Sequence, residues 1–203
     1  MRQSLICFMI VSALALTVGC ANPPTDKLAA AEKAVNEART IGAPTYLAED
    51  FAKLEGMLTT AKKEIAEQND KLALLRDYGK AEQLLAAVET DAARVNTEAA
   101  KKKEEAKTAA LQAQQAAQEA VKTTQELVKK APAGKDRAAL QAIKADAQGL
   151  TASLSEVQTA LDAGDYQAAQ TKAKAIQEKS QAVQAEIKGA MTKVGAARAK
   201  KGK

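Results

Sequence analysis

The sequence predicts an all-α protein: elongated antiparallel helical hairpins, packed as a coiled-coil-like bundle with one long central helix. Alanine, the best helix former, supplies 48 of the 203 residues, about half of the 46% hydrophobic content. Apolar residues recur at three- and four-residue steps between turns marked by proline or glycine. Only 2% of the residues are aromatic, with no Trp, which argues against a broad globular core. Disorder is the alternative, because buried alanine contributes little per residue.

Residues 1–19 have the pattern of a bacterial lipoprotein signal peptide. Arg2 supplies the positive charge, and residues 5–18 form an uncharged, mostly apolar run that falls short of the ~20 residues a spanning helix needs. The leader ends in Leu16-Thr17-Val18-Gly19-Cys20, which resembles a lipobox, where a small residue precedes the cysteine that is acylated. Thr17 departs from that pattern, since leucine is usual there.

Cys20 is therefore the predicted lipidation site and the mature N-terminus. The other cysteine, Cys7, lies in the leader, so the mature chain can form no intramolecular disulfide. Two or three acyl chains together anchor a protein stably in a bilayer. Ala21 follows the cysteine, and resemblance to enterobacterial sorting implies the inner leaflet of the outer membrane, facing the periplasm. In a source with a single membrane, the outer face of that membrane is expected instead.

Ordinary secretion is the alternative for this leader. Cleavage after the small-x-small run Ala13-Leu14-Ala15 would leave Cys20 as a free thiol.

The mature chain divides into a spacer and two predicted hairpins. Residues 20–24 hold the lipidated cysteine and a spacer, because Asn22-Pro23-Pro24 cannot continue a helix. Residues 25–131 form the first hairpin, which includes the long heptad helix. Residues 132–203 form the second hairpin and a basic C-terminal tail.

In the first hairpin, Thr25 or Asp26 is expected to cap a helix over 28–40, and Gly42-Ala43-Pro44 to end it. The apolar stripe of this helix comprises Leu28, Ala31, Val35 and Ala38, at three- and four-residue steps. A second helix begins near Thr45 and breaks between Asn69 and Gly79. Its apolar stripe comprises Phe51, Leu54, Leu58, Ala61 and Ile65, whereas Lys62, Lys63, Glu64 and Glu67 are expected to face water.

A helix of about fifty residues follows, from Tyr78 to Lys130. Within this helix, two series of residues each recur at seven-residue steps, which is typical of a coiled coil. They are Leu85, Ala92, Ala99, Ala106, Ala113, Ala120 and Leu127, and Ala81, Val88, Val95, Lys102, Ala109, Ala116 and Thr123. Lys102 interrupts the seam and is predicted to mark a change of partner helices. The seam also allows homo-oligomers.

The second hairpin opens with the turn Pro132-Ala133-Gly134, and Asp136 is expected to cap its first helix. That helix carries Leu140, Ile143, Ala147, Leu150, Leu154, Val157 and Leu161. The turn at 162–165 leads into a last helix that begins at Tyr166 and carries Ala169, Ala173, Ile176, Val183 and Ile187.

A shift of 88 residues relates the two halves and predicts a two-fold internal repeat. It aligns Asp77-Tyr78 with Asp165-Tyr166, Ala81 with Ala169, Val88 with Ile176, Val95 with Val183, and Glu98 with Glu186. Each tyrosine is expected to pack its ring under a turn while its hydroxyl stays in water.

The first half carries Leu28-Ala29-Ala30-Ala31-Glu32-Lys33-Ala34, then Gly42-Ala43-Pro44, then Tyr46 leading into residues 47–54, then Asp77-Tyr78-x-x-Ala81. Over residues 25–105 this resembles the helical-hairpin domains of bacterial envelope lipoproteins known as domain of unknown function 4398. The family tends to place proline after the tyrosine, whereas here Pro44 precedes Tyr46. The resemblance implies an exported helical lipoprotein and no established activity.

The residue types exclude most catalytic chemistry. Without histidine, and with Cys20 acylated, nucleophile–imidazole pairs and His/Cys metal sites are excluded. The chain has no Ser-x-x-Lys and no glycine-rich phosphate loop. Glu104-Glu105 and Glu49-Asp50 are interpreted as solvated helix faces rather than a carboxylate dyad. We therefore expect no enzyme, no cofactor and no metal.

The net charge is +5, with lysine runs at 101–103 and 129–130. Most such runs are solvated helix face. Export and the lack of interleaved aromatics argue against nucleic acid as a partner. The tail residues Lys200, Lys201 and Lys203 are candidates for contact with peptidoglycan carboxylates or anionic lipid.

Three functions remain open. The leading one is a membrane-anchored structural or adaptor protein of the envelope that binds a protein or peptidoglycan through its helices. The second is a peptidoglycan tether through the terminal Lys203, by resemblance to the major murein lipoprotein. The third is a protective, holdase-like chain that is largely unfolded alone.

Overall fold

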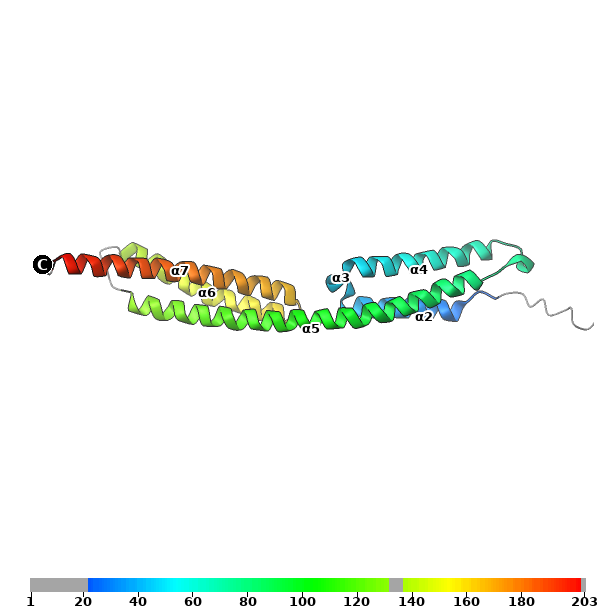
Figure 1. Cartoon of the computed structure of the whole chain (residues 1–203), viewed down its shortest axis with the longest axis horizontal. Helices are drawn as coiled ribbons and strands as arrows, with labels where there is room; N and C mark the ends of the chain where they lie inside the picture. The colour runs from blue at the N-terminus through cyan, green and yellow to red at the C-terminus, as the bar shows by residue number, and fades with distance from the viewer. Residues whose placement is uncertain (1–21, 132–136, 202–203) are drawn as a thin grey trace, which may run out of the picture. The chain divides into compact units, whose positions relative to one another are not determined.

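The computed structural model describes residues 22–131 and 137–201, and all regular structure in these ranges is helical (Figure 1). The elements are α2 (Thr25–Ile41), α3 (Ala43–Tyr46), α4 (Ala48–Asn69), the 3-10 turn η1 (Ala73–Leu75), α5 (Gly79–Lys130), α6 (Arg137–Asp162) and α7 (Tyr166–Lys201). The prediction of an all-α bundle with one long central helix is confirmed, and that helix is α5. The leader, Cys20, the turn at 132–134, Asp136 and Lys203 lie outside the described residues.

The described chain forms two compact units, which divide between Lys102 and Lys103. The first unit contains α2, α3, α4 and the N-terminal half of α5, and the second contains the C-terminal half of α5, α6 and α7. This division differs from the expected boundary at 131/132. The C-terminal half of α5 buries its apolar face with α6 and α7, so it belongs to the second unit.

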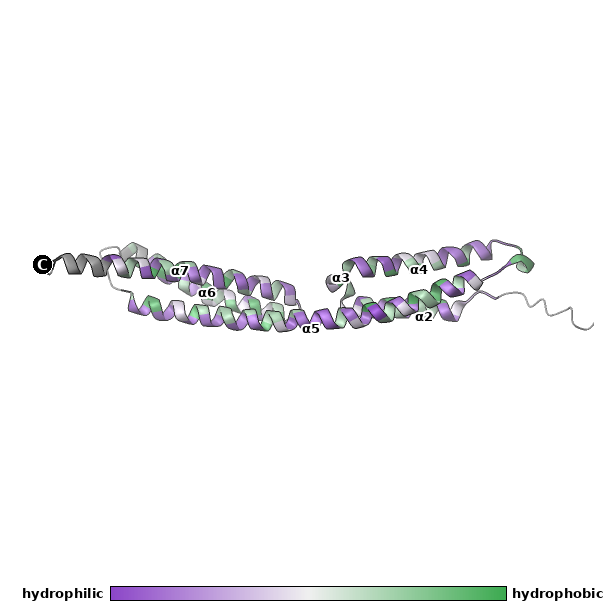
Figure 2. Ribbon diagram, viewed as in Figure 1, coloured by the Kyte–Doolittle hydropathy of each residue, from purple (hydrophilic) through white to green (hydrophobic). Residues whose placement is uncertain are grey.

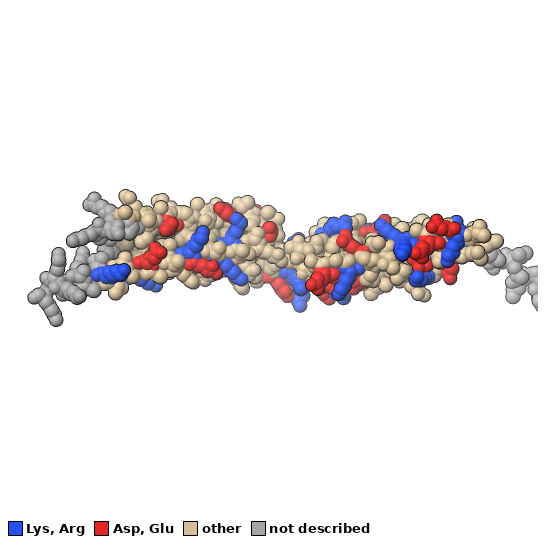
Figure 3. Space-filling view, turned by 90° about the horizontal axis from the view of Figure 1, so that it is seen from above, with Lys and Arg blue, Asp and Glu red and all other residues tan. Residues whose placement is uncertain are grey.

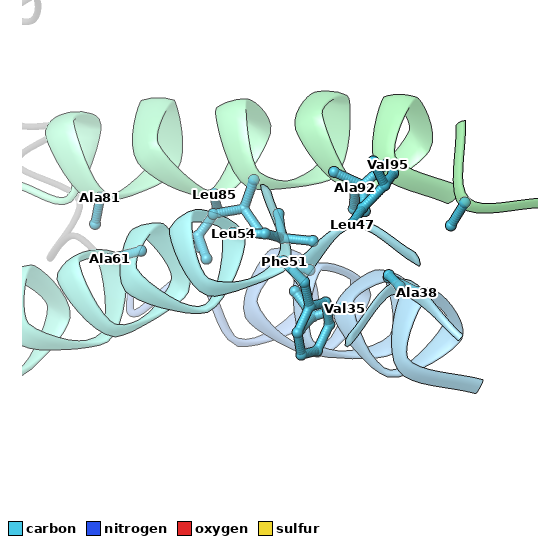
Figure 4. Close-up of a cluster of buried hydrophobic side chains, with 14 of the residues drawn as sticks. Val35, Ala38, Leu47, Phe51, Leu54, Ala61, Ala81, Leu85, Ala92 and Val95 are labelled. Carbon is cyan, nitrogen blue, oxygen red and sulfur yellow. The ribbon is translucent and has the colours of Figure 1, made fainter. Parts of the chain in front are cut away.

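The first unit has a continuous core in which three helices share their apolar stripes. Leu54 of α4 and Leu85 of α5 are fully buried, and Phe51 and Val35 lie beside them (Figure 4). The stripes expected on α2 and α4 are confirmed, with Leu28 and Leu58 only half-buried at their margins. Figure 2 shows how hydrophobic and hydrophilic residues alternate along each helix, as this packing requires.

Glu64 is an exception to the predicted pattern of α4. It was expected to face water, yet its side chain is 8% exposed. The buried face of α4 widens near its C-terminus to include Glu64 and Gln68, and both side chains are hydrogen-bonded there.

The turn between α2 and α4 depends on one glycine. Gly42 ends α2 with φ +108°, and its N–H bonds to the carbonyls of Ala38 and Arg39, as the sequence predicted. A Cβ at Gly42 would lie 3.2 Å from the ring of Tyr46. The chain then makes the single helical turn α3, with Pro44 in its first positions.

The expected cap of the first helix is wrong. Pro24 is the N-cap residue of α2, and no side chain caps this end by a hydrogen bond. Thr25 and Asp26 lie within the first helical turn. Proline suits this position because it lacks the N–H that a helix start leaves unpaired.

The second unit is built in the same way. Val157 of α6 and Ile187 of α7 are almost completely buried, together with Val121 of α5. α6 ends at Asp162 and α7 begins at Tyr166, as predicted, with Gly164 at φ +74° in the turn. The backbone of α7 continues as helix to Lys201, so the expected basic tail is helical at least that far.

The predicted heptad seam of α5 holds only in the first unit. Ala81, Leu85, Val88, Ala92, Val95 and Ala99 are buried as expected. Beyond Lys102 the buried positions become Ala110, Ala117, Val121 and Thr124, whereas Ala109 and Ala116 are half-buried and Thr123 is exposed. The seam therefore slips by one residue. An α-helix of 3.6 residues per turn drifts against a strict 3.5 repeat, and beyond Lys102 α5 faces different helices.

Both units repeat one pattern of buried positions. The first, second and third helices are α2, α4 and α5 in the first unit, where the single turn α3 is not counted, and α5, α6 and α7 in the second. In the third helices, buried residues correspond at a shift of 88 residues: Ala81, Leu85, Val88, Ala92, Val95 and Ala99 with Ala169, Ala173, Ile176, Ser180, Val183 and Ile187. In the second helix, Phe51, Leu54 and Ala61 correspond to Ala147, Leu150 and Val157 at a shift of 96. In the first helix, Ala31, Val35 and Ala38 correspond to Ala117, Val121 and Thr124 at a shift of 86. The shifts differ because the turns between the helices differ in length.

Candidate functional site

The most distinctive surface of the first unit is the α4–α5 connector, residues 70–78. It lies at the end of the unit where α2 begins, as Figure 1 shows. Lys27, in the first turn of α2, reaches across to Glu82, in the first turn of α5, with Nζ and Oε2 2.6 Å apart. The start of α2 and the end of the connector are therefore neighbours.

An ion pair between an exposed lysine and a buried carboxylate supports this end of the unit. The Lys80 ammonium lies 2.5 Å from Glu64 Oε2, and the Gln68 amide donates to Glu64 Oε1 at 3.0 Å. Lys80 itself is 72% exposed. The hydrogen bond from Lys80, with that from Gln68, lowers the pKa of Glu64, and the same contact raises the pKa of Lys80. The carboxylate is therefore held ionised although its side chain is covered.

The connector is fixed to the end of α4 by side-chain hydrogen bonds. Arg76 donates to the carbonyls of Asn69 at 2.8 Å and Lys71 at 3.1 Å. The Gln68 side-chain carbonyl accepts from the backbone N–H of Asp77 at 3.1 Å. These bonds satisfy groups that the end of a helix leaves unpaired. The connector therefore has a defined conformation.

Tyr78 closes the connector. Its ring is buried in the core, as expected, but its hydroxyl donates to the Asn69 side chain instead of staying in water. Tyr166, at the corresponding turn of the second unit, is half-buried and packs against that unit's core. The packing expected for these rings is confirmed, and the wet hydroxyl is wrong for Tyr78.

The fixed connector carries three exposed leucines. Leu72, Leu74 and Leu75 are 76%, 75% and 67% exposed, and they include the most exposed large apolar residues of the described chain. Figure 2 shows this short turn between α4 and α5 in green. These residues were not predicted to be functional, although three leucines within four positions at a helix break are a visible signal in the sequence. We call Leu72, Leu74 and Leu75 the leucine tip.

A second charged group lies on the side of the first unit. Arg94 of α5 bonds Asp50 of α4 at 3.1 Å and, on its own helix, Asp91 at 2.9 Å and Glu98 at 3.1 Å. These hydrogen bonds raise the pKa of Arg94. The sequence predicted Asp50 as part of a solvated face, whereas it is half-buried and pairs across two helices. Glu49, which precedes Asp50 in the sequence, is exposed, as expected.

Of the lysine runs at 101–103 and 129–130, only Lys103 is half-buried. Lys101, Lys102, Lys129 and Lys130 are exposed, as are Glu104 and Glu105. On the face that Figure 3 displays, acidic and basic side chains are interspersed within each unit. Over the ranges 22–131 and 137–201, no group of three carboxylates is placed to hold a metal ion.

The other residues predicted to act in binding are only partly placed. Lys200 and Lys201 lie in the last turns of α7, and Lys203 follows the described residues. A shallow surface groove lies between α5 and α6 of the second unit. It is lined in part by Val128, Ala131 and Leu140.

Within the described ranges, no helix combines the length and the hydropathy needed to cross a bilayer. No protein-family model, curated protein or solved structure matches this chain.

Proposed function

We propose that this chain is a membrane-anchored bacterial lipoprotein that serves as a structural or adaptor component of the cell envelope and is not an enzyme. The observation that carries the proposal is the end of the leader, Gly19-Cys20, followed by a spacer that leads directly into the first turn of α2. The acyl chains on Cys20 hold the protein at the bilayer, and its helices make the contacts with other envelope components.

Two features support an adaptor over a chain that is unfolded alone. Each unit has its own apolar core, and the turns between helices use fixed hydrogen bonds and left-handed glycines. Such specific packing gives each helix a defined outward face, which is what helix-mediated recognition of a partner requires. Circular dichroism of the mature chain tests this point: cooperative loss of helix on heating supports the proposal, and a random-coil signal in dilute buffer contradicts it.

The anchor is tested by labelling cells with radioactive palmitate. The wild-type chain is expected to take up label and to fractionate with membranes, and Cys20→Ser is expected to lose the label. Cys7→Ser is the matched control, because this cysteine lies in the leader and is removed with it. An unlabelled wild-type chain, or label that persists in Cys20→Ser, would contradict the proposal.

The adaptor role is tested by crosslinking in cells. A photoreactive residue at the exposed Lys144, on the α5–α6 groove, is compared with one at the exposed Lys53 of α4. We expect adducts of defined mass that form at one probe position and not at the other. Mass spectrometry should identify the crosslinked partner as an envelope protein or peptidoglycan. Release from boiled sacculi only after muramidase digestion would instead indicate the covalent tether through Lys203.

A further inference from the structure

The leucine tip lies at the end of the first unit from which the chain leads back to Cys20. Pro24 is buried at the start of α2, and Lys27 bonds Glu82 beside the connector. Cys20 precedes Pro24 by four residues. Because an extended chain spans at most about 3.5 Å per residue, Cys20 can be no more than about 14 Å from Pro24. Acyl chains on this cysteine would therefore bring this end of the unit to the membrane surface.

Exposure of the leucine tip is built into the fold. The bonds from Arg76 to the Asn69 carbonyl and from the Asp77 N–H to Gln68 hold the C-terminal end of the connector against the end of α4, and the Tyr78 ring is buried in the core. Leu75 closes the 3-10 turn by donating its backbone N–H to the Leu72 carbonyl at 2.8 Å. With its base fixed in this way, the connector presents its leucines to the outside. Clustered exposed leucines on a structured turn are unusual for a surface that faces only water.

The charges beside the leucine tip favour an apolar occupant over a charged one. The flanking pairs are Asp70-Lys71 and Arg76-Asp77, so the formal charges of the connector cancel. The Arg76 guanidinium is already bound to backbone carbonyls. Attraction to an anionic partner is therefore not what this surface offers.

We propose that the leucine tip inserts into the bilayer that holds the acyl chains of Cys20 and forms a second, apolar membrane contact of the first unit. This inference rests on the proposed anchor, which places the tip against lipid. Leu72, Leu74 and Leu75 occupy the boundary between the headgroups and the acyl chains, and a second attachment beside the one at Cys20 fixes how the first unit meets the membrane.

Tryptophan fluorescence tests the contact, because the natural chain has no Trp. Leu74→Trp is introduced into the acylated protein, purified from bacterial membranes and reconstituted into phosphatidylcholine vesicles with plain or brominated acyl chains. The control is Leu111→Trp, which replaces a 47% exposed leucine on α5 in the second unit. We expect a blue shift and at least a twofold quenching by brominated lipid for Leu74→Trp, and neither for Leu111→Trp.

A second variant connects the signal to the whole tip. Adding Leu72→Ser and Leu75→Ser to the Leu74→Trp protein should weaken the quenching, because burial of each leucine favours the inserted state about tenfold or more. Circular dichroism should show unchanged helix content, since none of the three side chains belongs to the core.

Each result decides between the two proposals. Intact mass reports acylation of the same sample, so an unacylated thiol would overturn the anchor and the position of the tip together. Acylated protein whose Leu74→Trp fluorescence is not quenched by brominated lipid would overturn the membrane contact alone. Equal quenching of both probes would also overturn it. A blue shift that depends on protein density and not on bromine would assign the tip to a second copy of the chain.

Discussion

Ser180 of α7 occupies the position in the second unit that Ala92 of α5 occupies in the first. Both residues are fully buried, both lie in the third helix of their unit, and they are 88 residues apart. Ala92 fills the site without a polar atom. The Ser180 hydroxyl has no hydrogen-bond partner among the described residues, although its backbone carbonyl lies 3.4 Å from the Thr124 hydroxyl.

Ser180→Ala should therefore stabilise the second unit by about 1 kcal/mol, because burial of an unpaired hydroxyl costs free energy that alanine avoids. The measurement is the free energy of unfolding from urea titration followed by circular dichroism. Ala92→Ser is the mirror control and should lower the stability of the first unit by a similar amount. A Ser180→Ala protein less stable than the wild type would show that the hydroxyl does make a stabilising contact.

Loss of Lys80 should destabilise the first unit, because Glu64 would remain covered and ionised without its strongest partner. Lys80→Met keeps the aliphatic part of the side chain and removes the charge. Lys63→Met is the control, since Lys63 and Glu67 are both well exposed and 3.8 Å apart. Exposed pairs of this kind contribute little. We expect a lower melting temperature for Lys80→Met and no measurable change for Lys63→Met.

The same pair should make stability depend on pH. The pKa of Glu64 is lower in the folded protein than in the unfolded chain, so its contribution is fully present above the unfolded value, roughly pH 4, and is lost as pH falls through the folded value. The stability difference between wild type and Glu64→Gln should be present at neutral pH and disappear in acid. A difference that stays constant down to low pH would contradict this.

Two glycines of the first unit should respond in opposite ways to alanine. Gly42→Ala should cost about 1–2 kcal/mol, because φ is +108° and the new Cβ would press on the Tyr46 ring. Gly56→Ala should stabilise by about 0.5–1 kcal/mol, because Gly56 lies inside α4 with nothing within 4 Å of its Cβ position. Urea titration of both variants measures the difference, and equal effects would contradict the left-handed turn.

Two leucines of α5 test how the helix is buried. Leu85→Ala should destabilise the first unit by about 2–5 kcal/mol, since Leu85 is fully buried in its core. Leu111→Ala should change stability by less than about 0.5 kcal/mol, since that side chain is 47% exposed. Thermal unfolding of the two variants provides the comparison. Similar losses for both would mean that Leu111 is covered in solution, as self-association would cause.

The sequence was sufficient for most of the helices and their inward faces. Stripes such as Leu54–Ala61 and Ile176–Val183 follow from three- and four-residue spacing, because burial of an apolar face dominates local propensity. The turns at Gly42 and Gly164 could be predicted for a similar reason. Glycine is the residue that takes positive φ without strain.

Features that depend on neighbouring helices could not be read from spacing alone. The slip of the α5 seam between Ala99 and Ala110 follows from which helices meet it there, and a heptad pattern contains no such information. The turns also differ in length between the units, so the single shift of 88 found in the sequence describes only the third helices.

The end of the first unit was the least predictable part. Glu64 is polar and was assigned to water, although its spacing from Ala61 and Gln68 is in phase with the buried stripe. Its burial becomes acceptable only because Lys80, sixteen residues later, returns to it across the connector. The leucine tip is the opposite case: its residues are apolar and yet exposed, because the hydrogen bonds of the connector turn them outward.

The sharing of α5 by both units has a consequence for how the chain can be cut. The boundary at Lys102 and Lys103 falls inside hydrogen-bonded helix and not in a loop. Proteases need an extended segment, so trypsin should spare both lysines in the native protein although Lys102 is exposed, and cleavage there would report unwinding of the helix. A gene fragment ending at residue 102 would truncate a helix instead of releasing an intact domain.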